Sequence, residues 1–134
     1  MDPPHPPLEF ARVAEFRAAL RVFLRKAEQN ARKSGLTPQR YLLLLMIKGA
    51  PSGRETSTVT ELAERLQLAQ STVTELVSRA EEIGLIAREQ SDSDGRVTNL
   101  KLTPEGERRL MQAFTTNEQE RQELRAAIAH LDAG

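Results

Sequence analysis

Residues 58–102 restrict the fold more than any other part of the chain, because two short helical patterns are followed there by two short strand patterns. Thr58 and Glu61 have the spacing of a capping box, which predicts that a helix begins at this point. After a short break, a second helix is expected over residues 71–83, with Gly84 as its C-terminal cap. The apolar residues fall on one face of each helix: Leu62, Ala63 and Leu66 in the first, and Val73, Leu76, Val77, Ala80 and Ile83 in the second.

Residues 85–89 and 96–102 are predicted strands, and the segment between them, Ser91-Asp92-Ser93-Asp94-Gly95, has the composition of a turn. Two short helices with a tight break, followed by a β-hairpin, form a winged helix-turn-helix. Each of these elements alone is common in proteins. Their order and their lengths together predict this fold.

Helices are also predicted before this segment. Residues 8–33 have apolar residues at spacings of three and four, as on one face of a helix. Thr37 and Pro38 have the order of an N-cap and a first helical residue, for a helix that ends near Lys48. This helix is apolar over most of its surface, and we therefore expect it at the centre of the core.

After the hairpin, Thr103 and Pro104 predict another helix start of the same kind. Leu110 and Phe114 are expected to face inward from this helix. A polar break near residues 115–117 then precedes a last helix. The expected fold class is mainly α with a small β-hairpin wing.

The composition excludes several classes of protein. The chain has no cysteine and two histidines, His5 and His130, close to its two ends. We therefore expect no metal, no cofactor and no thiol redox chemistry. No phosphate-binding glycine motif or nucleophile motif is present, so an enzyme is poorly supported. Without a signal peptide or a long apolar run, the expected location is cytoplasmic.

Short segments between residues 36 and 106 carry a resemblance to a known family. They are Leu36-Thr37-Pro38-Gln39, Thr58-Val59-Thr60-Glu61-Leu62-Ala63-Glu64-Arg65-Leu66, Ser71-Thr72-Val73-Thr74, Gly84-Leu85-Ile86, Asp94-Gly95-Arg96 and Leu102-Thr103-Pro104-Glu105-Gly106. Through them the chain resembles the MarR family of bacterial transcriptional regulators. The resemblance implies a winged helix-turn-helix fold, DNA binding, and N- and C-terminal dimerisation helices.

The predicted domain organisation follows from the element order and from this resemblance. Residues 1–7 are rich in proline, and we expect a disordered tail there. Residues 8–134 are expected to form one domain. Its winged helix-turn-helix core would cover residues 36–106, and its dimerisation helices residues 8–34 and 105–134.

The helix predicted over residues 71–83 has a polar side that fits DNA recognition. Short hydroxyl side chains at a helix N-terminus allow close approach to phosphates and to groove edges. The alternative is that Ser71 and Thr72 only cap the helix. The residues predicted to contact DNA from this segment are Gln70, Ser71, Thr72, Thr74, Glu75, Ser78 and Arg79.

The predicted wing adds three candidate residues. In the family that the chain resembles, an arginine two positions after an aspartate enters the minor groove from the wing tip, which implies this role for Arg96. Asp94 would brace Arg96 or the turn. Arg88, on the opposing strand, could contact phosphate. The alternative for Arg96 is an ordinary surface arginine on a hairpin.

The function predicted is that of a sequence-specific regulator of transcription, in particular a repressor, which binds a pseudo-palindromic operator on double-stranded DNA as a homodimer. The predicted dimer interface consists of Phe16, Leu20, Phe23, Leu124, Ile128 and Leu131. The resemblance also implies a small aromatic or anionic effector. Arg40 and Tyr41 could line its site, although a core role for Tyr41 is the stronger expectation.

A second hypothesis is a winged-helix adaptor that binds proteins and has no operator of its own. The net charge of the chain is zero, but residues 8–48 contain nine basic and three acidic residues, whereas residues 57–103 contain five basic and eight acidic ones. An acidic recognition segment favours the adaptor. Specific, salt-sensitive DNA binding would favour the regulator.

Overall fold

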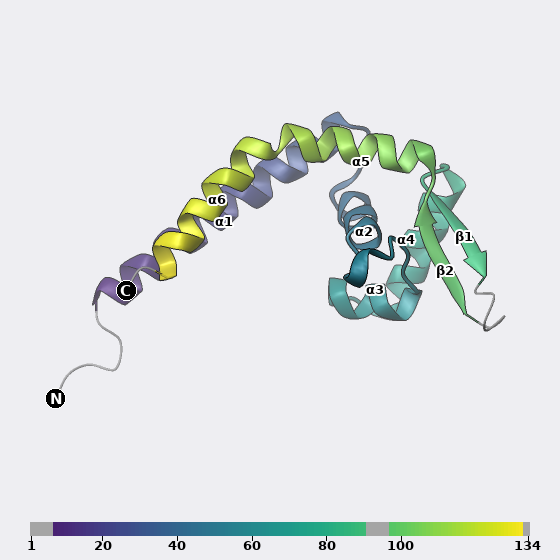
Figure 1. Ribbon diagram of the computed structural model, residues 1–134, viewed down its shortest axis with the longest axis horizontal. Coiled ribbons are helices and arrows are strands. Elements are labelled where there is room, and N and C mark those ends of the chain that lie inside the picture. The colour runs from purple at the N-terminus through teal and green to yellow at the C-terminus, as the bar shows by residue number, and fades with distance from the viewer. Residues whose placement is uncertain (1–6, 91–96, 133–134) are drawn as a thin grey trace.

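The computed structural model describes residues 7–90 and 97–132 (Figure 1). Helices dominate it, and the two strands pair as a small antiparallel sheet, which confirms the predicted fold class. In chain order the elements are α1 (Pro7–Lys33), α2 (Pro38–Lys48), the 3₁₀ helix η1 (Pro51–Gly53), α3 (Val59–Leu66), α4 (Gln70–Glu82), β1 (Ile86–Gln90), β2 (Thr98–Leu102), α5 (Pro104–Thr116) and α6 (Glu118–Asp132).

Three of the helices begin as their sequences predict. The hydroxyls of Thr37, Thr58 and Thr103 each accept a hydrogen bond from the backbone N–H three residues further on. At Thr58 the capping box is complete, because Glu61 also accepts a hydrogen bond from the backbone N–H of Thr58, over 2.9 Å. A side chain that satisfies these otherwise unpaired donors stabilises a helix start by about 1 kcal/mol.

The core lies between α2, α3, α4, α5 and the hairpin. Leu43, Leu44 and Ile47 of α2 are completely buried, which confirms that this helix is central. Val73 and Val77 of α4 are equally buried and attach α4 to the core by one face. The opposite face of α4 is therefore left in solvent.

Helices α1 and α6 form an arm that extends away from the winged helix-turn-helix part (Figure 1). Lys26 Nζ of α1 lies 3.9 Å from a carboxylate oxygen of Glu120 of α6, and Nε2 of His130 lies 3.1 Å from Glu15. Because the earlier residue of α1 pairs with the later residue of α6, the two helices run antiparallel. None of the described helices combines the length and the apolar composition that a membrane span requires.

Several predicted boundaries and orientations were wrong. Helix α4 begins at Gln70, after Ala69, whose side chain offers no cap, and β1 begins one residue later than expected. Ile83 is 45% exposed, and Phe114 is 38% exposed although the guanidinium of Arg121 on α6 lies over its ring, 3.6 Å from the centroid. Pro7, which was assigned to the tail, is the first residue of α1.

Candidate nucleic-acid interface

The exposed face of α4 carries the residues that the sequence predicted to contact DNA. Val73, Val77 and Ala80 have no exposed surface and hold the back of the helix against the core. Gln70, Ser71, Thr72, Thr74, Glu75 and Arg79 are exposed, and Ser78 is half-buried. Side chains at the N-terminal half of α4 are therefore available to a partner, together with the backbone N–H groups of the first turn.

Two charged side chains on this face, those of Glu75 and Arg79, form an ion pair. Nη2 of Arg79 donates a hydrogen bond to Oε1 of Glu75 over 2.8 Å, and both side chains remain more than half exposed. The spacing of four residues places them one turn apart on α4. An exposed pair of this kind contributes little to stability, about 0.3–0.5 kcal/mol.

Arg88 on β1 is also paired with a glutamate. Its Nε donates to Oε1 of Glu81 on α4 over 2.9 Å. This ion pair joins the wing to α4, and the sequence pattern did not predict it because the two residues belong to different elements. On the other side of the hairpin, Lys101 Nζ lies 3.4 Å from Glu89.

The two strands pair as a hairpin, with Ile86 opposite Leu102 and Gln90 opposite Thr98. The second strand was predicted from residue 96, whereas β2 begins at Thr98. It lies beside α4 at the end of the molecule opposite to the arm tip (Figure 1). The turn that joins its strands is outside the described residues, and so are Asp94 and Arg96. Their assigned roles therefore stay predictions.

A third backbone segment joins the wing. The backbone of Ser57 donates to the carbonyl of Leu100 over 3.1 Å and accepts from the N–H of Leu100 over 2.8 Å. Both residues are buried. The connection between α2 and α3 is thus fixed to β2. This bridge could not be predicted from the sequence, since one residue cannot show a strand pattern.

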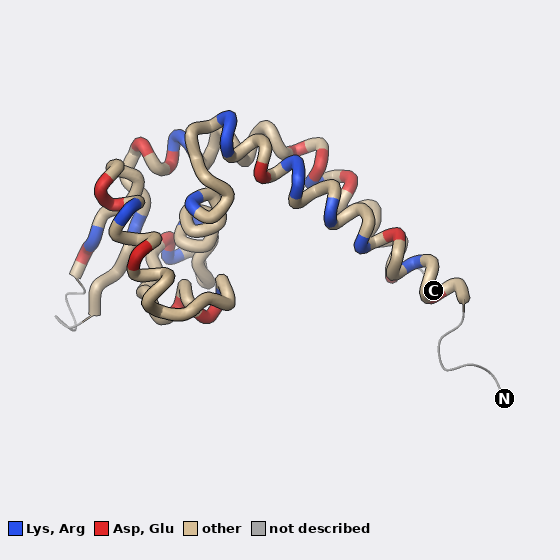
Figure 2. Tube along the Cα trace, turned by 180° about the vertical axis from the view of Figure 1, so that it is seen from behind, with Lys and Arg blue, Asp and Glu red and all other residues tan. Residues whose placement is uncertain are grey.

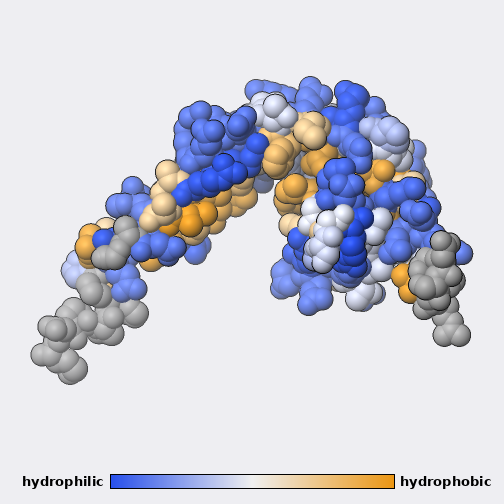
Figure 3. Space-filling model, in the orientation of Figure 1, coloured by the Kyte–Doolittle hydropathy of each residue, from blue (hydrophilic) through white to orange (hydrophobic). Residues whose placement is uncertain are grey.

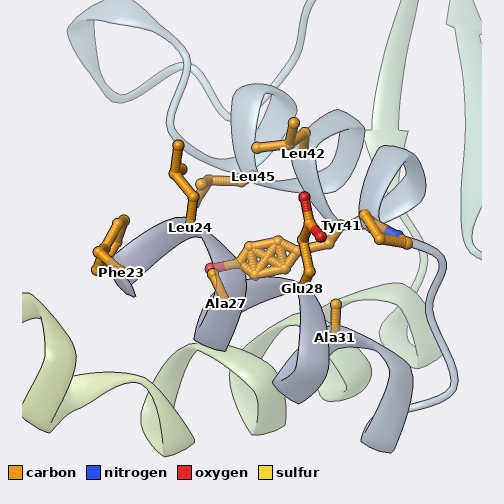
Figure 4. A pocket seen from close by; sticks show the side chains of 9 residues that line it. Phe23, Leu24, Ala27, Glu28, Ala31, Tyr41, Leu42 and Leu45 are labelled. Atoms are coloured by element: carbon orange, nitrogen blue, oxygen red, sulfur yellow. The ribbon is translucent and has the colours of Figure 1, made fainter. Parts of the chain in front are cut away.

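Of the two candidate effector residues, Tyr41 lines a cavity and Arg40 does not. Tyr41 is 6% exposed and lines an apolar cavity of about 110 Å³ between α1 and α2 (Figure 4). Burial raises the pKa of the Tyr41 hydroxyl, and the amide of Asn117 partly opposes this rise. Arg40 is not among the residues that line the cavity. Its lining is Phe23, Leu24, Ala27, Glu28, Ala31, Pro38, Tyr41, Leu42 and Leu45.

The candidate dimer residues lie on the arm. Phe16, Leu20 and Phe23 of α1 are half-buried, and so are Leu124 and Leu131 of α6. Ile128 is 44% exposed. Apolar side chains are visible along the side of the arm and below its junction with the winged helix-turn-helix part (Figure 3). Other exposed apolar residues of the arm are Leu8, Phe10, Val13, Val22 and Leu24.

Charged residues also recur along the arm (Figure 2). Arg17, Arg21 and Arg25 are exposed on α1 at intervals of four residues. The pairing of Lys26 with Glu120 joins a basic residue of α1 to an acidic residue of α6. Part of the excess positive charge of residues 8–48 is therefore compensated inside the chain.

The fold and the exposed helix define a winged helix-turn-helix protein. A sequence model described as MarR family matches residues 34–97. This part of the chain is similar to the MarR family.

Two curated relatives come from Bacillus subtilis (strain 168). The HTH-type transcriptional repressor MdtR is 37% identical over 79 residues, which are 59% of this chain and 48% of that protein. The organic hydroperoxide resistance transcriptional regulator is 36% identical over 74 residues, or 55% of this chain and 48% of that protein. The chain spans about half the length of these curated relatives.

Solved structures share the fold. The crystal structure of the YusO protein from Bacillus subtilis has a TM-score of 0.62 and 27% identity, and the match covers 79% of this chain and 72% of that chain. A mutant MarR from E. coli, solved in complex with operator DNA, has a TM-score of 0.65 and 22% identity, with 81% of this chain and 75% of that chain covered.

Proposed function

We propose that this protein is a sequence-specific DNA-binding regulator of transcription that acts as a repressor on a pseudo-palindromic operator. The observation that carries the proposal is the position of α4, which is attached to the core by Val73, Val77 and Ala80 and presents its polar N-terminal half to solvent. The similarity of residues 34–97 to the MarR family supports it, as does the similarity to MdtR, a transcriptional repressor. The proposal includes no catalytic step and implies a cytoplasmic protein, since bacterial operator DNA lies there.

In the proposed complex, α4 enters the major groove of double-stranded DNA and the wing reaches the adjacent minor groove. Ser71, Thr72 and Thr74 then approach base edges and phosphates, and Arg96 enters the minor groove from the predicted wing tip, where a narrow groove concentrates negative potential. Arg88 would contact phosphate after its carboxylate partner Glu81 is exchanged for the DNA backbone.

The proposed protein is a homodimer joined through its arm. A two-fold dimer presents two equivalent recognition helices to half-sites about one helical turn apart. The half-buried apolar residues of α1 and α6, together with Ile128, provide the surface for this interface.

A small effector is part of the same proposal. The cavity beside Tyr41 is apolar, and its volume of about 110 Å³ suits a ligand smaller than a typical drug molecule. Among the described residues that line it, Glu28 is the one that carries a charge, and this carboxylate opposes an anionic ligand. A small aromatic or aliphatic molecule therefore fits better than an anion.

The test is a fluorescence-anisotropy titration with duplexes from the promoters nearest to the gene and with random duplexes of equal length. Specific binding should be at least about 1,000-fold tighter than random binding, and it should weaken steeply with salt. Equal affinity for all duplexes at every salt concentration would contradict the proposal.

One observation favours the protein-binding adaptor as a second candidate. Arg79 and Arg88, which flank the exposed face of α4, are both ion-paired with glutamates and thus offer less positive charge to phosphate. An adaptor would show no specific, salt-sensitive binding in the same titration.

A further inference from the structure

The ion pair between Glu75 and Arg79 lies on the face of α4 that the proposed function turns toward DNA. The carboxylate accepts one hydrogen bond, from Nη2 to Oε1 over 2.8 Å, which leaves its second oxygen available to another donor. The guanidinium keeps further N–H groups besides the one that it gives to Glu75. The exposed fractions of these side chains are 66% for Glu75 and 62% for Arg79.

We propose that Glu75 and Arg79 act as one unit that recognises a C·G base pair in the major groove. This inference rests on the proposed function. The linked side chains present an acceptor beside a fork of donors, in a fixed order along α4. Glu75 lies in the N-terminal half of α4, the part of a recognition helix that contacts base edges, and Arg79 follows one turn later on the same side of the helix.

The edge of a C·G pair has the complementary order of groups. The N4 amino group of cytosine is a donor, and the O6 and N7 atoms of guanine are two neighbouring acceptors. Glu75 accepts from N4 while Arg79 donates to O6 and N7, and the ion pair between them is kept. All the charged groups of the unit are then satisfied when water is removed.

An A·T pair fits the same unit less well. Its one donor, the N6 amino group of adenine, lies between the acceptors N7 of adenine and O4 of thymine, and the thymine methyl group follows. If Glu75 accepts from N6, Arg79 reaches one acceptor instead of two. The unit therefore prefers C·G to A·T, and its fixed order along the helix also distinguishes C·G from G·C.

The pairing also affects binding to random DNA. Glu75 repels phosphate, and it reduces the positive charge that Arg79 offers to it. The carboxylate thus weakens sequence-independent binding and strengthens binding where cytosine supplies a donor.

The experiment is a selection of binding sites from randomised duplexes, followed by titrations on the selected site and on copies with single base-pair changes. The wild-type protein should select a C·G pair at one symmetric position of each half-site. Replacement of that pair by T·A should weaken wild-type binding by about 5- to 100-fold. Glu75→Gln should accept A·T at this position instead, because a glutamine pairs with N6 and N7 of adenine.

Two further variants separate this inference from simpler effects. Arg79→Lys keeps the charge but loses the fork of donors, and it should reduce the preference for C·G at the same position. Glu82→Gln removes an equal charge from the exposed side of α4 and should leave the preferred base pair unchanged. Thermal melts of all the variants verify that they are folded.

The outcomes distinguish the failure of this inference from the failure of the proposed function. If the wild-type protein selects a sequence, but Glu75→Gln only binds every duplex more tightly by one common factor, Glu75 acts through its charge alone and the inference is overturned. If the wild-type protein selects no sequence, the proposed function fails, and this inference fails with it.

Discussion

Asn30 of α1 donates a hydrogen bond from Nδ2 to Oδ1 of Asn117 over 2.6 Å, at the point where the chain passes from α5 to α6. Both side chains are buried. Asn117 also ends α5, since its backbone N–H bonds to the carbonyl of Phe114. One asparagine pair thus fixes where the arm leaves the body of the protein, and the amide of Asn117 acts on the hydroxyl of Tyr41 as well.

Asn117→Ala should lower the free energy of unfolding by about 1–3 kcal/mol, because it leaves the buried amide of Asn30 without its acceptor. The measurement is urea denaturation followed by circular dichroism. Thr116→Ala is the control. Its hydroxyl bonds to the backbone of Gln112 on an exposed face, and its loss should cost less than about 0.5 kcal/mol. Equal effects of the two changes would contradict the role of the asparagine pair.

Gly106→Ala should destabilise the protein by about 1–3 kcal/mol, although this exchange usually stabilises a helix. A Cβ atom at Gly106 would lie 2.2 Å from the carbonyl oxygen of Leu85, and the backbone must move to admit it. Thermal melts compare it with Gln112→Ala on the exposed side of the same helix, where we expect a change close to zero. A stabilised Gly106→Ala protein would show that α5 does not approach Leu85 so closely.

Glu105→Gln should lower the melting temperature at neutral pH, and the difference from wild type should disappear in acid. Hydrogen bonds from Arg108 and then Arg109 lower the pKa of Glu105 to about 2, from 4.5. A lowered pKa means that the contribution to stability is complete above about pH 4.5 and is lost as the pH falls through about 2. Melts from pH 7 to pH 2 follow this, with Glu64→Gln as the control for loss of one carboxylate outside the cluster.

Arg96→Ala should weaken binding to the true operator by about 1–3 kcal/mol if the side chain enters the minor groove. The slope of the logarithm of the binding constant against the logarithm of the salt concentration should fall in magnitude by about one unit per wing if a phosphate contact is lost too. Thr74→Ala should relax sequence preference more than overall affinity. Anisotropy titrations at several salt concentrations measure both, and wild-type affinity of the Arg96 variant would exclude the wing contact.

Light scattering should give a mass about twice 15.0 kDa at micromolar concentration. The reason is that apolar side chains of α1 and α6 stay exposed in a single chain, and a second copy would cover them. Ile128→Arg should weaken the dimer by placing a charge in the proposed interface. Leu68→Arg, at an exposed residue between α3 and α4, should leave the mass unchanged. A wild-type protein that stays monomeric over a wide concentration range would contradict the proposal that the arm forms a dimer interface.

The helix starts could be predicted from the sequence, because cap chemistry is local. Thr58 and Glu61 satisfy each other's backbone donors across three residues, and such a pattern is visible in any window that contains both. The central position of α2 could be predicted as well, because a helix that is apolar on most sides needs neighbours on most sides.

The rest depended on contacts between distant segments. The apolar stripes of α4 and α5 extend to Ile83 and Phe114, but a stripe does not reveal where the covering element ends. The pairing of Asn30 with Asn117 joins residues 87 positions apart, and no local pattern reports it. In the candidate interface, the spacing of four residues could have predicted the partner of Arg79, whereas the partner of Arg88 depends on how the wing lies beside α4.

The bridge between Ser57 and Leu100 restricts how far the wing can move relative to the helices beside it. The two reciprocal hydrogen bonds attach the wing to the segment that leads into α3, while the close approach of Gly106 to Leu85 holds the base of the wing against α5. We therefore expect the spacing between α4 and the wing to change little when DNA binds. On an operator in which one base pair is inserted between the two contacted regions, either α4 or the wing would lose its register.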